Sequence, residues 1–522
     1  MYSMKKRMPG FAGSQKEEAV IFLGFETMIF LAYSLFLNQT YNCDQMAAAF
    51  TENTDNFGTV LKNYILGGRP VSIIRLGIDW FFGLFGIHYL NHQWVMQAFT
   101  MLLLGLDAFL LYVVIRKYMD ESGRLLITFA VIIGFVNPFF VECFSFYGPD
   151  HALAVMLSIA GIYFFTKEKY GKSICFVFLS ISWYQTYYSF FLIYACVCIY
   201  LKTKGNISFD ILRKYVAACL TVAAAVLCNL FLVKAAAWIF GEAEVKPAGM
   251  PATLSAFFGK VHQVSDSYAF IFKNGYGFLP DYLVIVIVIL FGIAAMLVKL
   301  YKKDFFGLAW TLVLSGCIFI APAVYGLIMI HFYYPPRAAV PFFMALGGYL
   351  LITGFEIVQW ENSTSLAYHY FSTGIEAVLA IFLILMVHRT QLGISDILTA
   401  NRVEIQTCRD VDKYIKKYEQ ESRNTIEFIK VSHYSGAMLA FDHNYLNIRY
   451  EGYPSVATVL NAEWADVVML NFVTGENYKK EKITREEELQ YFGNYDKNTA
   501  LRSFDPDTQL VFKENTLYWM LY

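Results

Sequence analysis

Residues 19–46, AVIFLGFETMIFLAYSLFLNQTYNCDQM, place a long apolar run just before a lone acid. The run covers residues 19–37 and contains a single charged residue, Glu26. About 20 consecutive apolar residues in a helix cross the roughly 30 Å hydrocarbon core of a bilayer, so the run predicts a transmembrane helix. The acid, Asp44, follows the end of this helix closely and is expected at a membrane surface.

The whole chain has the composition of a membrane protein with many spans. Of its 522 residues, 57% are hydrophobic and 16% are charged, against about 25% charged residues in soluble domains. The net charge of −1 argues against a nucleic-acid partner. Apolar blocks predict a polytopic α-helical fold with about eleven transmembrane helices, at 19–37, 93–115, 125–143, 151–167, 173–186, 187–201, 215–240, 281–300, 305–331, 336–356 and 367–388.

Lysine and arginine set the expected orientation, because cytoplasmic loops are enriched in these residues. Basic clusters lie before the first span and in later loops, at 5–7, 116–124, 167–172, 202–214 and 299–303. All of them are cytoplasmic only if residues 173–201 cross the membrane twice. The sequence therefore predicts a cytoplasmic N-terminus and an extracytoplasmic first loop, with Asp44 outside.

Two further segments are expected on the outer side. Residues 67–85, GGRPVSIIRLGIDWFFGLF, carry Arg75 and Asp79 at the spacing of a helical ion pair, and predict a helix on the membrane surface. Residues 390–522 are polar and mix strand-like runs, VVMLNFV at 467–473 among them, with a helical one. They predict a small extracytoplasmic α/β domain after a transmembrane domain of residues 1–389.

Polar and aromatic side chains recur at the expected outer surface. Arginine binds phosphate oxygens in a planar fork, and a carboxylate can take a proton from an attacking hydroxyl. The candidates are Asp44, Arg69, Glu142, Tyr147, Asp150, His151, Tyr184, Gln185 and Arg337. A lone acid after a helix is more often an ordinary solvated loop residue, and an arginine at a helix end also reaches lipid headgroups. The nine cysteines are scattered and form no metal-binding pattern.

The order of these pieces resembles the glucosyltransferase II family of bacterial membrane glycosyltransferases, which is similar to the wider GT-C group of polyprenol-dependent transferases. The matching pieces are Asp44 after the first span, GRP at 68–70, NPFFVECFSFYGPDHALAV at 137–155, SISWYQTYYSFF at 180–191, and Pro336 with Arg337. The resemblance covers most of 19–389. The family often has two adjacent acids at the first position, whereas Cys43 and Gln45 flank Asp44 here.

The resemblance implies transfer of glucose or another hexose from a polyprenyl-phosphate carrier, such as undecaprenyl phosphate, to a cell-surface glycan such as O-antigen. The reaction would invert the anomeric carbon, with Asp44 as base, alone or with Asp150, and with Arg69 and Arg337 at the leaving phosphate. The implied substrate contacts are Glu142, Tyr147, His151, Tyr184 and Gln185. A carrier-sugar synthase and a flippase are the implied partners. No cofactor is expected, and no ligand set supports a divalent metal.

A lipid or polysaccharide transporter is the alternative. Glu26, Asp107 and Glu376 are acids inside predicted spans, and intramembrane acids are costly enough to mark a function. The sequence lacks the inverted repeat and the paired broken helices that are typical of such transporters. A glycan polymerase or ligase is a third reading. Substitution of Asp44, compared with substitution of the three intramembrane acids, separates the transferase from the transporter.

Overall fold

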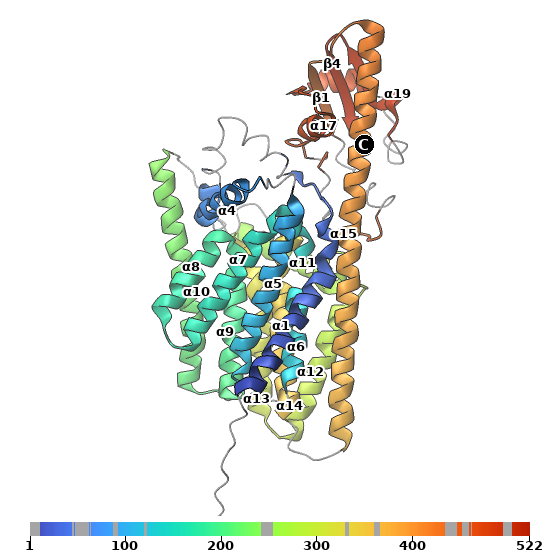
Figure 1. Ribbon diagram of the computed structural model, residues 1–522. Coiled ribbons are helices and arrows are strands. Elements are labelled where there is room, and N and C mark those ends of the chain that lie inside the picture. Colours follow the sequence, from blue (N-terminus) through green and yellow to red (C-terminus); the bar gives the residue numbers. More distant parts are fainter. Residues whose placement is uncertain are drawn as a thin grey trace, which may run out of the picture.

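Long helices form a bundle, and a small sheet domain lies beyond one end of it (Figure 1). This computed structural model describes residues 11–43, 46, 62, 64–86, 92–119, 123–241, 254–328, 334–359, 366–433, 446–451, 459–460, 462–493 and 504–521. We call the bundle end near the sheet domain the sheet-side end, and the opposite end the far end. Apolar runs form helices because a helix satisfies its own backbone polar groups where water is absent.

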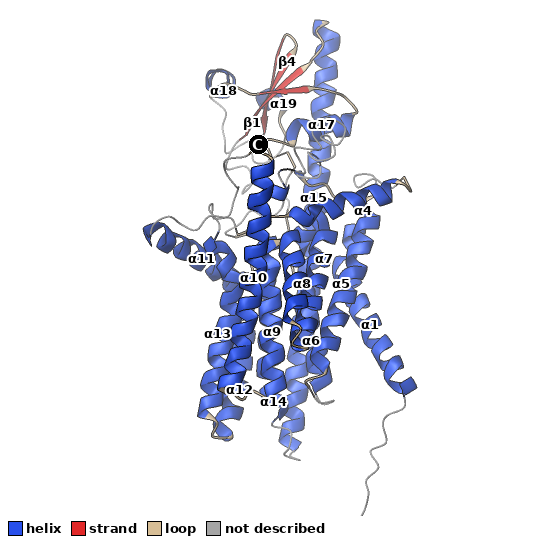
Figure 2. Cartoon of the chain, turned by 90° about the vertical axis from the view of Figure 1, so that its left-hand side faces the viewer, coloured by secondary structure: helices blue, strands red, loops and turns tan. Residues whose placement is uncertain are grey.

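The bundle helices run alternately toward and away from the sheet-side end (Figures 1 and 2). In the described part of the chain, nine helices are long and apolar enough to cross a membrane, and α6 and α8 are shorter. The polytopic helical prediction is confirmed. The bundle consists of α1 (Phe11–Tyr33, extended by η1, Ser34–Leu37), α5 (Gln93–Arg116), α6 (Arg124–Phe135), α7 (Phe140–Thr166), α8 (Tyr170–Trp183), α9 (Tyr188–Thr203), α10 (Phe209–Ile239), α12 (Leu283–Tyr301), α13 (Phe305–Ile328), α14 (Pro336–Val358) and α15 (Leu366–Ser422).

The predicted span 125–143 is not one helix. α6 ends at Phe135, and α7 begins at Phe140. Between them Pro138 has no backbone N–H to continue a helix. The Asn137 side chain replaces the missing contacts, because its Nδ2 donates to the Gly134 carbonyl at 2.6 Å and its Oδ1 accepts from the Phe139 N–H at 3.1 Å.

Residues 173–201 form two helices, as predicted. α8 ends at Trp183, Tyr184 is extended, and the short helix η4 (Gln185–Tyr187) leads into α9. This turn lies at the sheet-side end, so the basic loops before α8 and after α9 lie at the far end. There Glu18 of α1 pairs with Arg116 at 3.2 Å, and Lys214 pairs with Glu168 at 2.9 Å.

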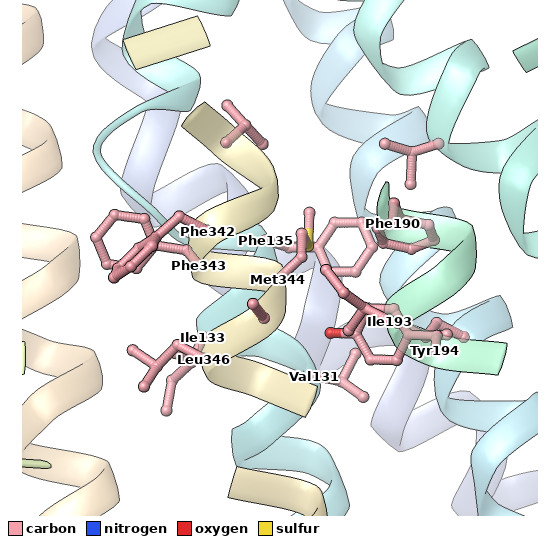
Figure 3. Close-up of a cluster of buried hydrophobic side chains, with 14 of the residues drawn as sticks. Val131, Ile133, Phe135, Phe190, Ile193, Tyr194, Phe342, Phe343, Met344 and Leu346 are labelled. Carbon is pink, nitrogen blue, oxygen red and sulfur yellow. The ribbon is translucent and has the colours of Figure 1, made fainter. Parts of the chain in front are cut away.

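The centre of the bundle is the contact between α6, α9 and α14. Phe135, Phe190 and Met344 interdigitate there (Figure 3). α14 is buried along its length, and a Cβ on its Gly347 would lie 2.5 Å from the Ala130 carbonyl oxygen of α6. Only glycine allows this approach, and close backbone packing of this kind holds helices together where lipid removes the hydrophobic driving force.

A short helix lies across the sheet-side end, as expected for residues 67–85. It is α4 (Ile73–Gly83), which follows η2 (Pro70–Ser72) and lies across the bundle end in Figure 2. Its Trp80 and Phe81 are 68% and 52% exposed, which suits contact with lipid. A second helix at this end, α11 (Leu254–Asn274), leads into α12.

α15 leaves the bundle and continues into the sheet domain (Figure 1). The sheet has the order β2-β1-β4-β3, in which β1 pairs parallel to β2 and β4, and β3 pairs antiparallel to β4. The elements are β1 (Phe428–His433), α17 (Asp466–Thr474), β2 (Lys479–Glu481), α18 (Arg485–Phe492), α19 (Pro506–Gln509), β3 (Leu510–Lys513) and β4 (Thr516–Leu521). The boundary expected at residue 389 falls inside α15, and the division into two domains stays a prediction.

The strand-like run 467–473 is a helix, so this expectation was wrong. It forms α17, which has Asp466 in its first turn and Gly475 in the left-handed conformation, φ 75°, at its end. A short apolar run cannot be assigned to strand or helix by periodicity alone. Its flanking acid and glycine are helix start and stop signals.

Candidate active site

α7 is broken where the predicted site residues lie. Tyr147 is buried and has φ 132° and ψ 80°, outside the helical region. A non-glycine residue in such a conformation costs about 1–3 kcal/mol and persists only where its surroundings enforce it. The next residue, Gly148, has no room for a side chain, because a Cβ would lie 2.7 Å from the Thr100 side chain of α5. The break places Asp150 and His151 in the first turn of a new helical segment at the sheet-side end.

The first half of α7 holds Arg337. The Glu142 carboxylate accepts from the Arg337 backbone N–H at 2.8 Å and forms an ion pair with its guanidinium. The side chain of Glu142 is 3% exposed and that of Arg337 is 15% exposed. A carboxylate that binds both the backbone and the side chain fixes the orientation of the guanidinium. The predicted contact of Glu142 with a substrate stays a prediction.

A histidine and two tyrosines lie beside this pair. The Nδ1 atom of His151 lies 3.0 Å from the Tyr187 hydroxyl, and the His151 and Tyr184 ring centroids are 4.4 Å apart. His151 and Tyr187 are both buried. Tyr187 was not among the predicted site residues, although it stands in the quoted run YQTYY. The conformation of the turn between α8 and α9 decides which of these tyrosines contacts His151. The sequence alone does not show that conformation.

Arg69 reaches the site from the other side. Its guanidinium carbon lies 5.4 Å from the centre of the Tyr64 ring and 5.8 Å from that of Tyr184, which are distances of cation–π contacts. Both arginines interact electrostatically with His151 and with Tyr184. The guanidinium groups of Arg69 and Arg337, which are far apart in the sequence, therefore both lie near the side chains of His151 and Tyr184.

The backbone before Arg69 is fixed by amide side chains. Gln185 Nε2 donates to the Gly67 carbonyl at 2.8 Å, and Asn229 Nδ2 of α10 donates to the Gly68 carbonyl at 3.2 Å. Gly68 has φ 82°, and a Cβ there would lie 2.3 Å from Gln185 Nε2. Only glycine fits this position. The sequence analysis missed Asn229, because the sequence of an apolar helix does not show which group a polar side chain within it will contact.

The remaining predicted residues have different outcomes. Asp44 lies outside the described residues. Asp150 is half-buried beside His151. Among the described residues, no group of three or more His, Cys, Asp and Glu side chains is placed to hold a metal ion. The expectation that the protein needs no cofactor stays a prediction.

Two of the acids named for the transporter alternative lie on neighbouring helices. A Cβ on Gly105 of α5 would lie 2.4 Å from the carboxyl carbon of Glu26 of α1. Asp107 is fully buried, and neither of its carboxylate oxygens has a hydrogen-bond partner among the described residues. Buried carboxylates normally have hydrogen-bond partners, so Asp107 is a residue whose role a substitution should test.

The comparison with known families agrees with the motif order. A family model described as glucosyl transferase GtrII matches residues 33–355, more than half of the chain. The matched range contains the arginines, Glu142, His151 and the α8–α9 turn, and it ends within α14, before α15 and the sheet domain. No curated protein matches the chain. The resemblance inferred from the sequence is thereby confirmed, and the chain belongs to the glucosyl transferase GtrII family of glucosyltransferases.

Proposed function

We propose that this glucosyltransferase takes its sugar, glucose or another hexose, from a polyprenyl-phosphate carrier and transfers it to a cell-surface glycan outside the cytoplasm. One observation carries the proposal: Arg69 and Arg337 converge at one end of an apolar bundle, beside His151 and Tyr184. A carrier of this kind has an apolar tail and a phosphate at the membrane surface. The bundle offers lipid contact along its length and two guanidinium groups at its end.

The two arginines would stabilise the leaving phosphate. Negative charge grows on the phosphate oxygens as the bond to the anomeric carbon breaks, and fixed donors are most effective where such charge develops. Glu142 keeps Arg337 in place, and the rings of Tyr64 and Tyr184 support Arg69. The guanidinium groups would thus perform the neutralising role that a divalent metal has in other phosphate-dependent enzymes.

Asp44 would act as the general base. In an inverting transfer, the acceptor hydroxyl oxygen attacks the anomeric carbon from the face opposite the phosphate. Its proton passes to the Asp44 carboxylate, the anomeric carbon–oxygen bond breaks, and polyprenyl phosphate leaves with the bonding electron pair. The assignment rests on the position of Asp44 after α1 in the sequence. Asp150, beside His151, is the second candidate for this role.

Aromatic and polar side chains would bind the sugar. Tyr184 and His151 lie near the two arginines, and we propose that they bind the sugar together with Tyr147, the buried residue at the break in α7. Aromatic rings stack on the apolar faces of sugars, and the contact with Tyr187 fixes the orientation of the His151 ring. Other proteins would load the carrier with sugar and turn it to the outer face, which makes a carrier-sugar synthase and a flippase the expected partners.

The proposal is tested by offering the purified protein a panel of polyprenyl-phosphate hexoses with a glycan acceptor and measuring the release of polyprenyl phosphate. We expect release with at least one donor, and a loss of about 10²–10³-fold in Arg69→Ala and in Arg337→Ala. Arg213→Ala is the matched control, because Arg213 is an exposed arginine whose partner is Asp210 at the far end. Wild-type rates in both site variants would refute the assignment.

A further inference from the structure

The first loop is fastened to the rest of the molecule directly after α1. The Thr40 backbone N–H and hydroxyl donate to Gln93 Oε1 at 2.9 and 3.2 Å. The Tyr41 N–H donates to Asn401 Oδ1 at 2.7 Å, and Asn401 Nδ2 donates back to the Tyr41 carbonyl at 3.2 Å. Asn401 lies on α15, far from Tyr41 in sequence. We call residues 40–43 together with Met46 the first-loop anchor.

Asn401 is itself held rigidly. It is 2% exposed, and its Nδ2 also lies 3.3 Å from Glu404 Oε2. Glu404 is fully buried, and its Oε1 accepts from the Leu460 N–H at 2.8 Å. Because the Tyr41 N–H requires an acceptor, the Asn401 amide has one orientation only. Leu460, which follows β1 in the sequence, is thus connected to Tyr41 of the first loop through Glu404 and Asn401 of α15.

Apolar contacts extend this connection. Cys43 and Met46 are buried in the core of the sheet domain, not in the core of the bundle. That core also contains Cys408 and Val411 of α15 and Met469 and Leu470 of α17. The Tyr41 ring lies edge-on to Phe472 of α17, with centroids 5.4 Å apart. The first-loop anchor is therefore built into the sheet domain, although α5 to α14 separate the two in sequence.

We propose that Asn401 is a positioning residue, through which α15 and the sheet domain hold the first-loop anchor and so place the segment to which Asp44 belongs by sequence. This inference rests on the proposed function of Asp44. A misplacement of about 1 Å in a reacting group can cost about 10²-fold in rate. The proposed donor phosphate contacts are Arg69, directly before η2, and Arg337 of α14, so loosening the anchor slows turnover more than it weakens donor binding.

Asn401→Leu keeps the approximate volume and removes both hydrogen bonds to Tyr41. The matched control is Gln391→Leu, because Gln391 is another α15 amide, and its Nε2 donates to the Leu31 carbonyl of α1 at 2.6 Å. Amide hydrogen exchange in a peptide covering residues 38–46, measured by mass spectrometry, reports on the anchor without reference to activity. Kinetics with a polyprenyl-phosphate hexose give kcat and KM.

In Asn401→Leu we expect faster exchange at residues 38–46 and a fall in kcat of about tenfold or more, with the donor KM within about twofold. Gln391→Leu should change neither. Asn401→Gln keeps the amide and should restore part of both properties. Asn401→Ala, which also removes both hydrogen bonds to Tyr41, replaces Asn401→Leu if that variant fails to fold. Unchanged exchange, or faster exchange with unchanged kcat, would overturn the inference. If the wild type transfers no sugar at all, the proposed function fails, while the exchange result still decides whether Asn401 holds the anchor.

Discussion

The two ends of the bundle each contain a buried acid paired with a base, but the two pairs differ in their surroundings. At the far end, Glu356 of α14 lies 2.9 Å from Lys299 Nζ and accepts from the Tyr200 hydroxyl at 2.6 Å, and Asp304 also lies 2.9 Å from Lys299 Nζ. One cation there meets two acids. At the sheet-side end, Glu142 meets Arg337, and Arg69 adds a second positive charge.

This difference separates a structural cluster from the proposed binding site. The far-end cluster needs no further anion, and its lysine is 6% exposed. At the sheet-side end two arginines lie near one buried acid, Glu142, and Arg69 Nε is buried without a hydrogen-bond partner in the described part of the chain. A phosphate fits the planar donors of guanidinium groups, and we propose that these two arginines bind the phosphate of the carrier.

The largest expected effect concerns the reaction at the sheet-side end. Asp44→Asn keeps size and polarity but removes the base, so we expect transfer to slow by about 10²–10⁴-fold with donor binding unchanged. Turnover and donor binding are measured on the purified variant, with Asp150→Asn as control and a milder expected loss. A normal rate in Asp44→Asn together with an inactive Asp150→Asn would assign the base to Asp150.

The far-end cluster should affect stability and leave chemistry intact. Lys299→Met removes the cation and leaves Glu356 buried beside Asp304, which costs about 3–5 kcal/mol when one partner of a buried pair is lost. We expect a lower Tm in detergent, and an unchanged donor Kd in the folded fraction. Loss of donor binding at an unchanged Tm would show that the far end takes part in function.

Asp107 tests the transporter alternative. Its carboxylate is fully buried without a hydrogen-bond partner among the described residues, so Asp107→Leu removes an unsatisfied polar group. Such a replacement should stabilise the protein by about 1–3 kcal/mol and preserve transfer. The readouts are the Tm and the rate of polyprenyl phosphate release. An inactive but well-folded Asp107→Leu protein would favour a function that runs through the intramembrane acids.

The smallest expected effect is a pH dependence confined to the sheet domain. A hydrogen bond from Lys430, together with the Thr484 N–H, lowers the pKa of Glu487 from 4.5 to about 2. Because the folded pKa is lower than the unfolded one, this contribution to stability is present above about pH 4.5 and is lost as pH falls toward 2. Unfolding of the sheet domain followed by circular dichroism should show this loss. Lys430→Met should reduce it, and an unchanged acid dependence in that variant would contradict the assignment.

The sequence predicted the helices well because long apolar runs have few alternatives in a membrane protein. The α8–α9 pair was predicted from the positions of the basic residues, and β3 and β4 lie within residues 390–522, where strand-like runs were predicted. The break at Asn137 and the helix α17 were missed, because a short apolar segment fits several structures. In each case the deciding residues were a proline or a glycine close to the run.

The site was predicted in part, and its connections were not. Arg69, Arg337, His151 and Tyr184 were candidates, and the fold brings them together. Tyr187, Asn229 and Asn401 were absent from the candidates. Tyr187 contacts His151, Asn229 binds the backbone of Gly68 next to Arg69, and Asn401 binds the backbone of Tyr41 in the first-loop anchor. Their roles depend on which segments pack against each other in the fold, and the residues around each of them in the sequence do not show this.

The most direct test of the central claim is the affinity for polyprenyl phosphate, the proposed leaving group, in wild type and in Arg337→Lys. The substitution keeps the charge and removes the planar fork, so we predict that Kd rises by about tenfold, or about 1.4 kcal/mol. Lys299→Arg at the far end is the matched exchange and should leave Kd unchanged. Equal Kd values for wild type and Arg337→Lys would contradict phosphate binding by Arg337 at the sheet-side end.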